Sequence, residues 1–481
     1  MNRRMILNTV GKMLLAEGLF LLLPALTALI YGEAKGLIAL LITVGIALLS
    51  GGMMCGLAKP KSAVIYAKEG FFIVSASWIL LSLVGALPFT ISGEIPNYID
   101  AVFETVSGLT TTGASILTDV EAMSHGMLFW RSFTHWIGGM GVLVFVMAIL
   151  PNVSERSIHI LRAEAPGPVV GKLVPRLKDT ARLLYVIYIA LTALLTVLLL
   201  AGGMSPFDSL IHAFGTAGTG GFGVRADSIA SYSPYLQWVI TVFMLIFGVN
   251  FNLYYLILVR RFKTALKSSE FWAYVTIVLL ATGGVAVSIW GQYGSAEETV
   301  RHAAFQVSSI VTTTGFATTD FNLWPQFAKG ILLLLMFIGG CAGATAGGFK
   351  VSRIVILFKQ IRRELQKMLH PRSVKTLRFE GHQLEEQTTR GVLSYLALYL
   401  ICFLVIFLFV SADSFGDFET HFSSTASCFN NVGPGFAGVG PTANFASYSL
   451  LSKLVLSAGM LLGRLEIIPL LIFFSPSSWK K

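Results

Sequence analysis

The chain has 481 residues, of which 54% are hydrophobic and only 12% are charged. Its mean hydropathy is +0.73. Soluble domains carry about twice that charged fraction, so an ordinary soluble enzyme or binding domain is excluded. The net charge of +10 could suggest a nucleic-acid partner, but the basic residues follow the ends of apolar segments, and we expect no nucleic acid. The four cysteines have the spacing of neither a zinc site nor a disulfide framework, so we interpret them as packing residues.

The apolar residues fall in blocks of about twenty, which is the length that crosses a bilayer as a helix. The first block resembles a signal peptide, but no small-x-small cleavage site follows it and a second block begins at Leu37, which favours an uncleaved membrane helix. We predict ten spanning helices near residues 12–31, 37–57, 71–91, 127–150, 182–203, 235–259, 271–290, 327–357, 391–411 and 450–474.

Most lysines and arginines fall at one set of loops and helix ends, in runs such as "KPKSAVIYAK", "RRFKTALK" and "KVSRIVILFKQIRRELQK". Basic loops stay on the cytoplasmic side of a membrane, which predicts that both termini are cytoplasmic. The chain is therefore expected to be an all-α polytopic protein of a cytoplasmic membrane.

A short segment recurs four times between apolar blocks: "SGLTTTG", "FGTAGTG", "SIVTTTG" and "SCFNNVG", which end at Gly113, Gly220, Gly315 and Gly433. Each copy follows a short stretch with helical potential that is too short to span a membrane. Such half-helices occur in membranes only where protein buries them or water lines them. We predict four outer helix, half-helix, glycine loop and inner helix units around one pore, after two extra N-terminal helices. The two extra helices are predicted in residues 1–60, and the four units in residues 61–165, 166–265, 266–380 and 381–481.

Loops of this kind suit a monovalent cation, because glycine adopts positive φ without steric cost and rings of carbonyl oxygens replace an ion's hydration shell. Half-helix C-termini would add negative potential. The acids at the outer starts of the half-helices would either form a negative vestibule or serve as helix caps and first-turn residues. The expected ion-binding residues are Thr111, Thr112, Gly113, Gly218, Thr219, Gly220, Thr313, Thr314, Gly315, Asn431, Val432 and Gly433.

The four units, together with "NNVGPGF" and "GRLEIIPLL", resemble the Trk/Ktr/HKT superfamily of potassium transporters, and most closely its bacterial Trk membrane subunits. The second and fourth copies depart from the threonine-rich form, so perfect four-fold symmetry is not expected. The resemblance implies gated potassium uptake across a bacterial cytoplasmic (inner) membrane, a homodimer within membrane lipid, and a cytosolic nucleotide-binding regulatory ring like TrkA. We assign the ring's contacts to basic loops near residues 156–182, 260–267 and 353–378, and expect no organic cofactor.

The segment "GGCAGATAGGFK", from Gly339 to Lys350, lies inside the predicted helix 327–357. Its glycines at a spacing of four could form a close-packing helix face, but five glycines make a poor helix in lipid, which favours a broken helix facing the pore. The resemblance implies that this segment is a gating loop, and that Arg464 limits cation flow. The alternative for Arg464 is a structural ion pair with another helix. The expected gate residues are Gly339, Gly340, Gly343, Ala344, Thr345, Gly347, Gly348, Lys350 and Arg464.

Other functions have weaker support. "GTGGFG" at Gly218–Gly223 matches a dinucleotide fingerprint, but no strand precedes it. A cation-coupled secondary transporter of a small solute would also use broken helices, although commonly with inverted repeats and two-fold pseudosymmetry. A membrane enzyme ranks last, because no nucleophile–base pair or paired carboxylates occur at membrane depth.

Overall fold

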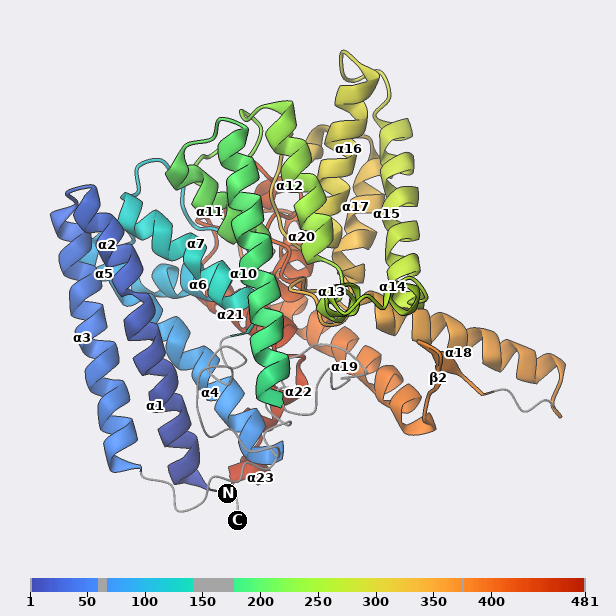
Figure 1. The fold of residues 1–481 in the computed structure, drawn as a ribbon, viewed down its shortest axis with the longest axis horizontal. Coiled ribbons are helices and arrows are strands. Elements are labelled where there is room, and N and C mark those ends of the chain that lie inside the picture. The colour runs from blue at the N-terminus through green and yellow to red at the C-terminus, as the bar shows by residue number, and fades with distance from the viewer. Residues whose placement is uncertain (1, 59–66, 142–176, 373–375, 480–481) are drawn as a thin grey trace.

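A computed structural model describes residues 2–58, 67–141, 177–372 and 376–479 (Figure 1). These residues are helical apart from irregular loops and one two-stranded hairpin. Six of the described helices are long and apolar enough to cross a membrane, and the bent pair α12–α13 would make a seventh. The prediction of an all-α membrane protein is confirmed, while several of the ten predicted spans are divided into shorter helices.

Three N-terminal helices lie at one side of the molecule (Figure 1). Gly11 and Gly51 let α1 and α3 approach closely, since a Cβ on either would meet the other's carbonyl oxygen. The bounds are α1 Arg3–Phe20, α2 Leu22–Ile30 and α3 Ala34–Leu57.

The first repeat contains the outer helix α4–α5, the half-helix α6 and the inner helix α7. The Asn97 side chain caps α6 by accepting a hydrogen bond from the Ile99 N–H at 2.9 Å, as short polar residues do at helix starts. The predicted inner helix 127–150 ends at Gly139, and its part beyond residue 141 lies outside the described residues. The bounds are α4 Ala67–Gly85, α5 Leu87–Ser92, α6 Tyr98–Leu109 and α7 His125–Gly139.

The second repeat has a sharp break in its inner helix. We predicted one helix over 235–259, but the chain bends by 91° between α12 and α13. Gly248 ends α12, and the Asn250 side chain caps α13 by accepting from the Asn252 N–H at 2.9 Å. The bounds are α10 Leu177–Ala201, α11 Pro206–Ala217, α12 Pro234–Phe247, α13 Phe251–Leu258 and α14 Phe262–Ala265.

The third repeat also has a broken inner helix, as predicted. The segment 339–350 separates α17 from α18, and α18 runs out of the body of the molecule together with the β1–β2 hairpin (Figure 1). The bounds are α15 Ser269–Ser288, α16 Ala296–Val311, η2 Phe321–Leu323, α17 Gln326–Ile338 and α18 Val351–Leu369, with β1 Arg378–Phe379 antiparallel to β2 His382–Gln383.

The fourth repeat also consists of an outer helix, a half-helix and an inner helix. The predicted single helix 450–474 is wrong, because α21 ends at Arg464 and α22 begins at Ile468, after two residues of positive φ, Glu466 and Ile467. The bounds are α19 Glu386–Val410, α20 Phe418–Asn430, η3 Ala437–Val439, α21 Leu450–Arg464, α22 Ile468–Phe474 and α23 Pro476–Trp479.

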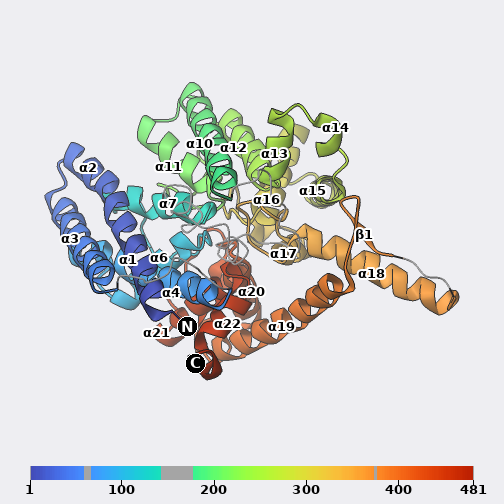
Figure 2. The same ribbon diagram turned by 60° about the horizontal axis from the view of Figure 1, so that its bottom comes forward.

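The repeats close into a ring in chain order (Figure 2). Each half-helix packs against the inner helix of its own repeat and that of the preceding repeat: α11 on α7 and α12, α16 on α12 and α17, and α20 on α17 and α21. The first half-helix, α6, packs on α7 and on α21 of the fourth repeat, so the last unit meets the first. The predicted unit boundaries stay predictions, and those near residues 60 and 165 lie outside the described residues.

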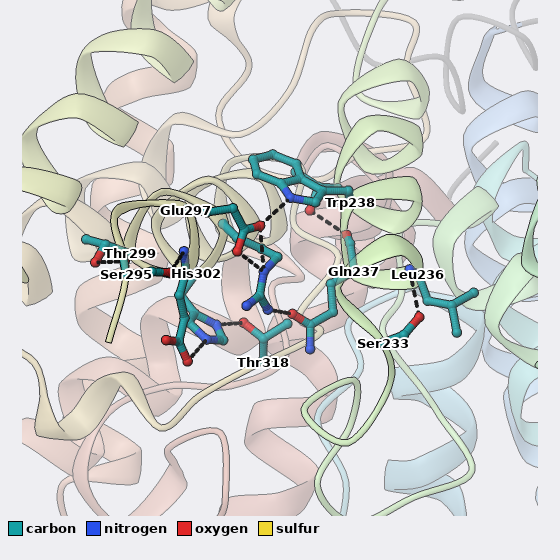
Figure 3. Close-up of polar contacts among 12 residues, drawn as sticks. Ser233, Leu236, Gln237, Trp238, Ser295, Glu297, Thr299, His302 and Thr318 are labelled. Carbon is teal, nitrogen blue, oxygen red and sulfur yellow. Dashed lines mark hydrogen bonds and ion pairs between the residues drawn. The ribbon is translucent and has the colours of Figure 1, made fainter. Parts of the chain in front are cut away.

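Polar contacts fix the outer halves of α12 and α16 (Figure 3). The Trp238 indole N–H donates to Glu297 at 2.9 Å, and Arg301 donates both to Glu297, at 3.0 Å, and to the Gln237 side chain. The Gln237 amide also donates to the Ile229 carbonyl at 3.1 Å. Because Gln237 bonds both a helix and the loop that follows the second half-helix, this network positions the loop from its outer side.

Candidate functional site

The four predicted loops share one backbone conformation. Two residues after each half-helix ends, or one in the fourth repeat, a residue other than glycine has left-handed φ, and a glycine of positive φ follows two residues later. The left-handed residues are Thr111 (56°), Thr219 (55°), Thr313 (55°) and Asn431 (58°). The glycines are Gly113 (81°), Gly221 (80°), Gly315 (85°) and Gly433 (106°). Asparagine tolerates this region, but β-branched threonine does not, so three loops are strained at the same position.

This register corrects one predicted residue. The sequence alignment of the four repeats placed the glycine of the second loop at Gly220, but Gly221 carries the positive φ. Hydrogen bonds fix the alignment independently: the N–H of Gly220 donates to Gly215 at 2.8 Å, as that of Thr112 donates to Ser107 at 2.8 Å. Gly220 is therefore the counterpart of Thr112, and Gly218 is the counterpart of Thr110.

The loops touch one another in a closed cycle. A Cβ added to Gly113 would collide with the carbonyl oxygen of Gly220 in the second repeat. The same collision joins the remaining repeats. A Cβ on Gly221 would meet the Thr314 oxygen, one on Gly315 the Val432 oxygen, and one on Gly433 the Thr112 oxygen. Each glycine thus leaves room for a main-chain oxygen of the next repeat, and four such oxygens lie around one axis.

One cavity opens onto this ring, and all four positive-φ glycines line it. At the ring itself, the Thr111 hydroxyl and the Asn431 side-chain oxygen are buried and have no hydrogen-bond partner among the described residues. Buried polar atoms are rarely left without a partner. These two side-chain oxygens are therefore left to bonds with groups outside the described residues, such as water.

The acids at the outer starts of the half-helices are largely engaged. Three of them contact a basic side chain: Asp100 with Lys453 at 2.8 Å, Glu297 with Arg301 at 3.0 Å, and Glu419 with Lys329 at 2.8 Å. Asp417 caps α20, and the hydrogen bond from the Thr420 hydroxyl holds the pKa of Asp417 below its ordinary value. These acids therefore serve as caps and first-turn residues, and the ion pairs offset much of the vestibule's negative charge.

Beneath the ring, residues 339–350 form an irregular loop. Gly339, Gly343 and Gly348 have φ between 74° and 78°, which excludes the alternative of a continuous small-residue helix face. The N–H groups of Phe349, Lys350 and Val351 donate to Phe337, Ile338 and Gly340 at 2.9–3.2 Å. The two ends of the loop are thus tied together while its middle projects from the helix. We call residues 339–350 the cross-loop.

The cross-loop reaches three repeats. Its Gly347 N–H donates to the Thr313 hydroxyl of the third ring loop at 2.7 Å. On the second repeat it docks at the break between α12 and α13, where the Cys341 N–H donates to the Gly248 carbonyl at 3.0 Å. The Phe251 N–H returns a bond to the Gly343 carbonyl at 3.1 Å. The helix break that sequence analysis missed is therefore a docking site for the cross-loop.

Arg464 binds the cross-loop from the fourth repeat. Its guanidinium donates to the Thr345 carbonyl at 2.7 Å, and to the carbonyls of Gly138 and Gly139 at 2.6 and 2.7 Å. Glu466 is instead paired with Arg353. The end of α21 reads "LGR", whereas the sequence reads "IGG" at the end of α7, "IFG" through the C-cap of α12 and "IGG" just past the end of α17. In this sequence alignment, a long cation takes a position that is glycine in the other three repeats.

Glu270, which sequence analysis did not identify, anchors the other side of the cross-loop. It is 4% exposed, and its Oε1 accepts the N–H of Ala342 at 2.7 Å and that of Ser352 at 3.1 Å. Glu380 of the β1–β2 turn caps α15 by accepting the Glu270 N–H at 2.9 Å. A single carboxylate therefore joins the first part of the cross-loop to the start of α18, and the hairpin holds the helix that carries this carboxylate.

A second buried charge was also missed. Arg131 on α7 donates to Glu104 on α6 at 2.6 Å, and both side chains are at most 4% exposed. Glu104 also accepts from the Ser115 hydroxyl and the Ile116 N–H, each at 2.9 Å. Arg131 stacks 3.5 Å from the centre of the Phe222 ring. The pair joins the segments that leave the first and second ring loops. Only the spatial pairing of two helices reveals it, since Glu104 and Arg131 lie 27 residues apart.

Comparison with known proteins agrees with this architecture. A family model described as a cation transport protein, TrkH, matches residues 40–481. The chain belongs to the TrkH family. It is 38% identical to the Trk system potassium uptake protein TrkH of Escherichia coli strain K12, and 31% identical to TrkI of Halomonas elongata. The first alignment covers all of both chains, and the second covers 99% of this chain and 97% of TrkI.

A solved relative extends the TrkH assignment to the fold. The crystal structure of the potassium transporter TrkH from Vibrio parahaemolyticus superposes with a TM-score of 0.89, at 35% identity and over all of both chains. Membership of the TrkH family and the apolar helices identify a multi-pass membrane protein of the cation-transport class.

The Glu104–Arg131 pair should contribute strongly to stability. We expect Arg131→Ala to lower the free energy of unfolding by about 3–5 kcal/mol, because it leaves a buried carboxylate without its cation. Replacing both residues by alanine should cost less than the sum of the two single changes. Thermal unfolding in detergent measures this, with Arg390→Ala in the exposed pair with Glu386 as the control. Additive losses would show that the two charges do not stabilise each other.

Removing the Glu270 anchor should loosen the cross-loop locally. Cys341 is completely buried in that loop, and Cys428 is completely buried in α20. Hydrogen bonds to a charged group contribute about 1.5–3 kcal/mol each, so Glu270→Ala should raise the rate of Cys341 labelling by a membrane-permeant thiol reagent at least tenfold. Cys55 and Cys402 are replaced by serine beforehand. Parallel acceleration at Cys428 would instead indicate general unfolding.

Proposed function

We propose that the chain takes up potassium across a bacterial inner membrane, through the ring of main-chain oxygens contributed by its four loops. The observation that carries the proposal is the cyclic contact in which each positive-φ glycine packs against a carbonyl oxygen of the next repeat. Carbonyl oxygens contributed by four loops can together replace the water shell of a cation. The C-terminal ends of α6, α11, α16 and α20 add negative potential at the same place.

Potassium is the transported substrate in this proposal. The relatives' names describe potassium uptake, and the site consists of neutral oxygens, which suit a weakly hydrated monovalent ion. No observation favours a cation-coupled transporter of an organic solute or an enzyme. In the second repeat, the proposed filter therefore includes Gly221 in addition to Gly218, Thr219 and Gly220.

The cross-loop acts as the gate in this proposal. It lies directly under the third ring loop through the Gly347–Thr313 bond, and Arg464 holds its middle from the opposite side. A positive charge near a permeating cation raises its energy: at ~6 Å and an effective dielectric of about 20, two unit charges repel by roughly 3 kcal/mol. Opening requires the cross-loop to leave Thr313 and Arg464, with Glu270 as the fixed end.

We further propose a homodimer that binds a cytosolic TrkA-like ring. The apolar residues Phe358, Ile361, Leu365 and Met368 recur along α18 at spacings of three and four, and each is more than half exposed. This spacing is a coiled-coil seam, which a second copy of α18 would cover. Basic residues on α18, and on the segment that connects α18 to the hairpin, then face the cytosolic regulatory ring. The basic loop 156–182 proposed for the same contact lies largely outside the described residues.

The filter proposal is tested at the ring glycines. An L-residue at φ near 80° costs of order 1–3 kcal/mol, and its Cβ would also displace the neighbouring carbonyl. We expect Gly113→Ala, Gly221→Ala and Gly315→Ala each to reduce potassium flux into vesicles at least tenfold, or to admit sodium. Gly330→Ala, where a Cβ has open space, is the matched control. Wild-type flux and ion preference in all three variants would place the pathway elsewhere.

The gate proposal is tested at Arg464. Arg464→Ala removes both the charge and the bond to Thr345, so flux per folded molecule should rise severalfold to tens-fold. Arg464→Lys keeps the charge while losing the three-carbonyl geometry, and should raise flux less. Vesicle flux is measured beside thermal stability. Lost stability in Arg464→Ala without any gain in flux would assign this arginine a structural role alone.

A further inference from the structure

A deep apolar groove lies between the second and third repeats, at the break in the inner helix. Its volume is about 410 Å³, and its walls include Val242, Leu245 and Leu253 on one side and Phe271, Val275 and Leu279 on the other. Val242 and Leu279 are 49% and 66% exposed. The groove therefore opens sideways, out of the ring and toward lipid, rather than into the ion pathway.

The groove exists because of how α12 is held. Its outer half is fixed to α16 by the Trp238–Glu297 and Gln237–Arg301 contacts, and α15 packs on α16 as well. Below Phe247 the chain turns by 91°, so α13 leaves the space that a straight helix would fill beside α15. Figure 1 shows α13 and α14 across the ends of α12 and α15, where α18 also leaves the body.

Unpaired cations lie on the chain segment whose Ile257, Ala265 and Leu266 line the groove. The segment from α13 to the start of α15 has no acidic residue between Phe251 and Ser269, and its basic side chains make no ion pair within the described part of the chain. All four basic residues are exposed: Arg260, Arg261, Lys263 and Lys267. Two acids close to this segment bind other groups. Glu270 accepts a hydrogen bond from the cross-loop, and Glu380 accepts one from the first turn of α15.

The same segment carries features of a membrane interface. Leu258 is 64% exposed, Phe262 52% and Trp272 53%, and the Trp272 indole donates to the Leu266 carbonyl at 2.8 Å. Exposed aromatic and aliphatic side chains interleaved with lysine and arginine are typical of a helix at the headgroup level. A negative headgroup above an apolar slot satisfies both the charges and the exposed carbon surface.

The inner wall of the groove is the docking site of the cross-loop. Val249 and Tyr274 line the groove and pack in one core cluster with Cys341. Gly248 and Phe251, on either side of Val249, make the two backbone bonds to the cross-loop. Anything that fills the groove therefore supports the bend on which the cross-loop rests.

We propose that this groove binds an anionic phospholipid of the inner leaflet. One acyl chain occupies the slot between α12 and α15, and the phosphate lies on Arg260, Arg261, Lys263 and Lys267. Occupancy stabilises the bend and so favours the docked cross-loop. The regulatory part rests on the proposed gate, and the assignment to the inner leaflet rests on the predicted membrane orientation, whereas binding of an anionic phospholipid in the groove rests on neither.

Lipid retention tests the site without any flux measurement. The full-length protein is purified in detergent with equal amounts of phosphatidylglycerol and phosphatidylcholine, and bound lipid is counted by native mass spectrometry. We expect the wild type to retain phosphatidylglycerol preferentially, since each Lys or Arg near an anionic headgroup favours binding. Replacing the four cations by glutamine, or filling the slot with Val275→Trp, should reduce retention at least tenfold.

The matched controls keep charge and surface constant. Leu280→Trp adds the same ring to α15 outside the groove, at a position 72% exposed, and glutamine at Arg362, Arg363, Lys367 and Arg372 removes four cations from and just beyond α18. Both should retain lipid like the wild type. Equal retention of both lipids, or loss in the controls to the same extent, would overturn the site. Normal lipid retention in the groove variants with weakened binding of the regulatory ring would assign the cations to a protein contact instead.

Flux then tests the regulatory part. In phosphatidylglycerol vesicles, Val275→Trp should conduct at least twofold faster than Leu280→Trp while keeping the wild-type ion preference. Lost preference would point to the filter and would leave the groove assignment to the retention experiment. Reduced flux in Val275→Trp, with lipid lost, would overturn the proposed sign of regulation.

Discussion

The ring of loops depends on one steric condition: the backbone of each repeat must approach a carbonyl oxygen of the next more closely than a Cβ permits. Gly113, Gly221, Gly315 and Gly433 meet it in turn. Because the fourth contact returns to Thr112 of the first repeat, none of the loops can relax outward without opening the cycle. The left-handed threonines preceding these glycines are tolerated only because the surrounding half-helices over-determine their conformation.

The inner helices of the repeats are interrupted or end just beneath this ring, and each interruption makes different contacts. At α12–α13 the break exposes the Gly248 carbonyl, which receives the Cys341 N–H. At α17–α18 it produces the cross-loop, and at α21–α22 it leaves Arg464 at a helix end. Freed backbone groups at membrane depth must find partners within the protein. Here they find one another, so broken helices supply the contacts that hold the cross-loop.

The sequence predicted the half-helices well, because each begins with a polar cap and carries its own apolar pattern. It did not predict the 91° bend after Phe247, because "FGVNFN" contains one glycine, two asparagines and no proline, and glycine and asparagine also occur in continuous membrane helices. The second ring glycine was placed one residue early because "GTGG" offers several glycines and only the hydrogen-bond register distinguishes Gly220 from Gly221. Glu104–Arg131 and the Glu270 anchor are contacts between segments distant in sequence, which no local pattern encodes.

Departures from four-fold symmetry are concentrated on one side of the ring. The cross-loop belongs to the third repeat alone, and the cation at the end of α21 replaces a glycine found in the other three. Gly138 and Gly139 of the first repeat present carbonyls to Arg464, whereas Gly248 of the second presents its carbonyl to the cross-loop. Equivalent helix ends thus bind different partners. In the proposed function, the ring serves an ion that contacts all four repeats, whereas the proposed gate needs two positions, and the asymmetric lower layer could supply them without disturbing the ring above.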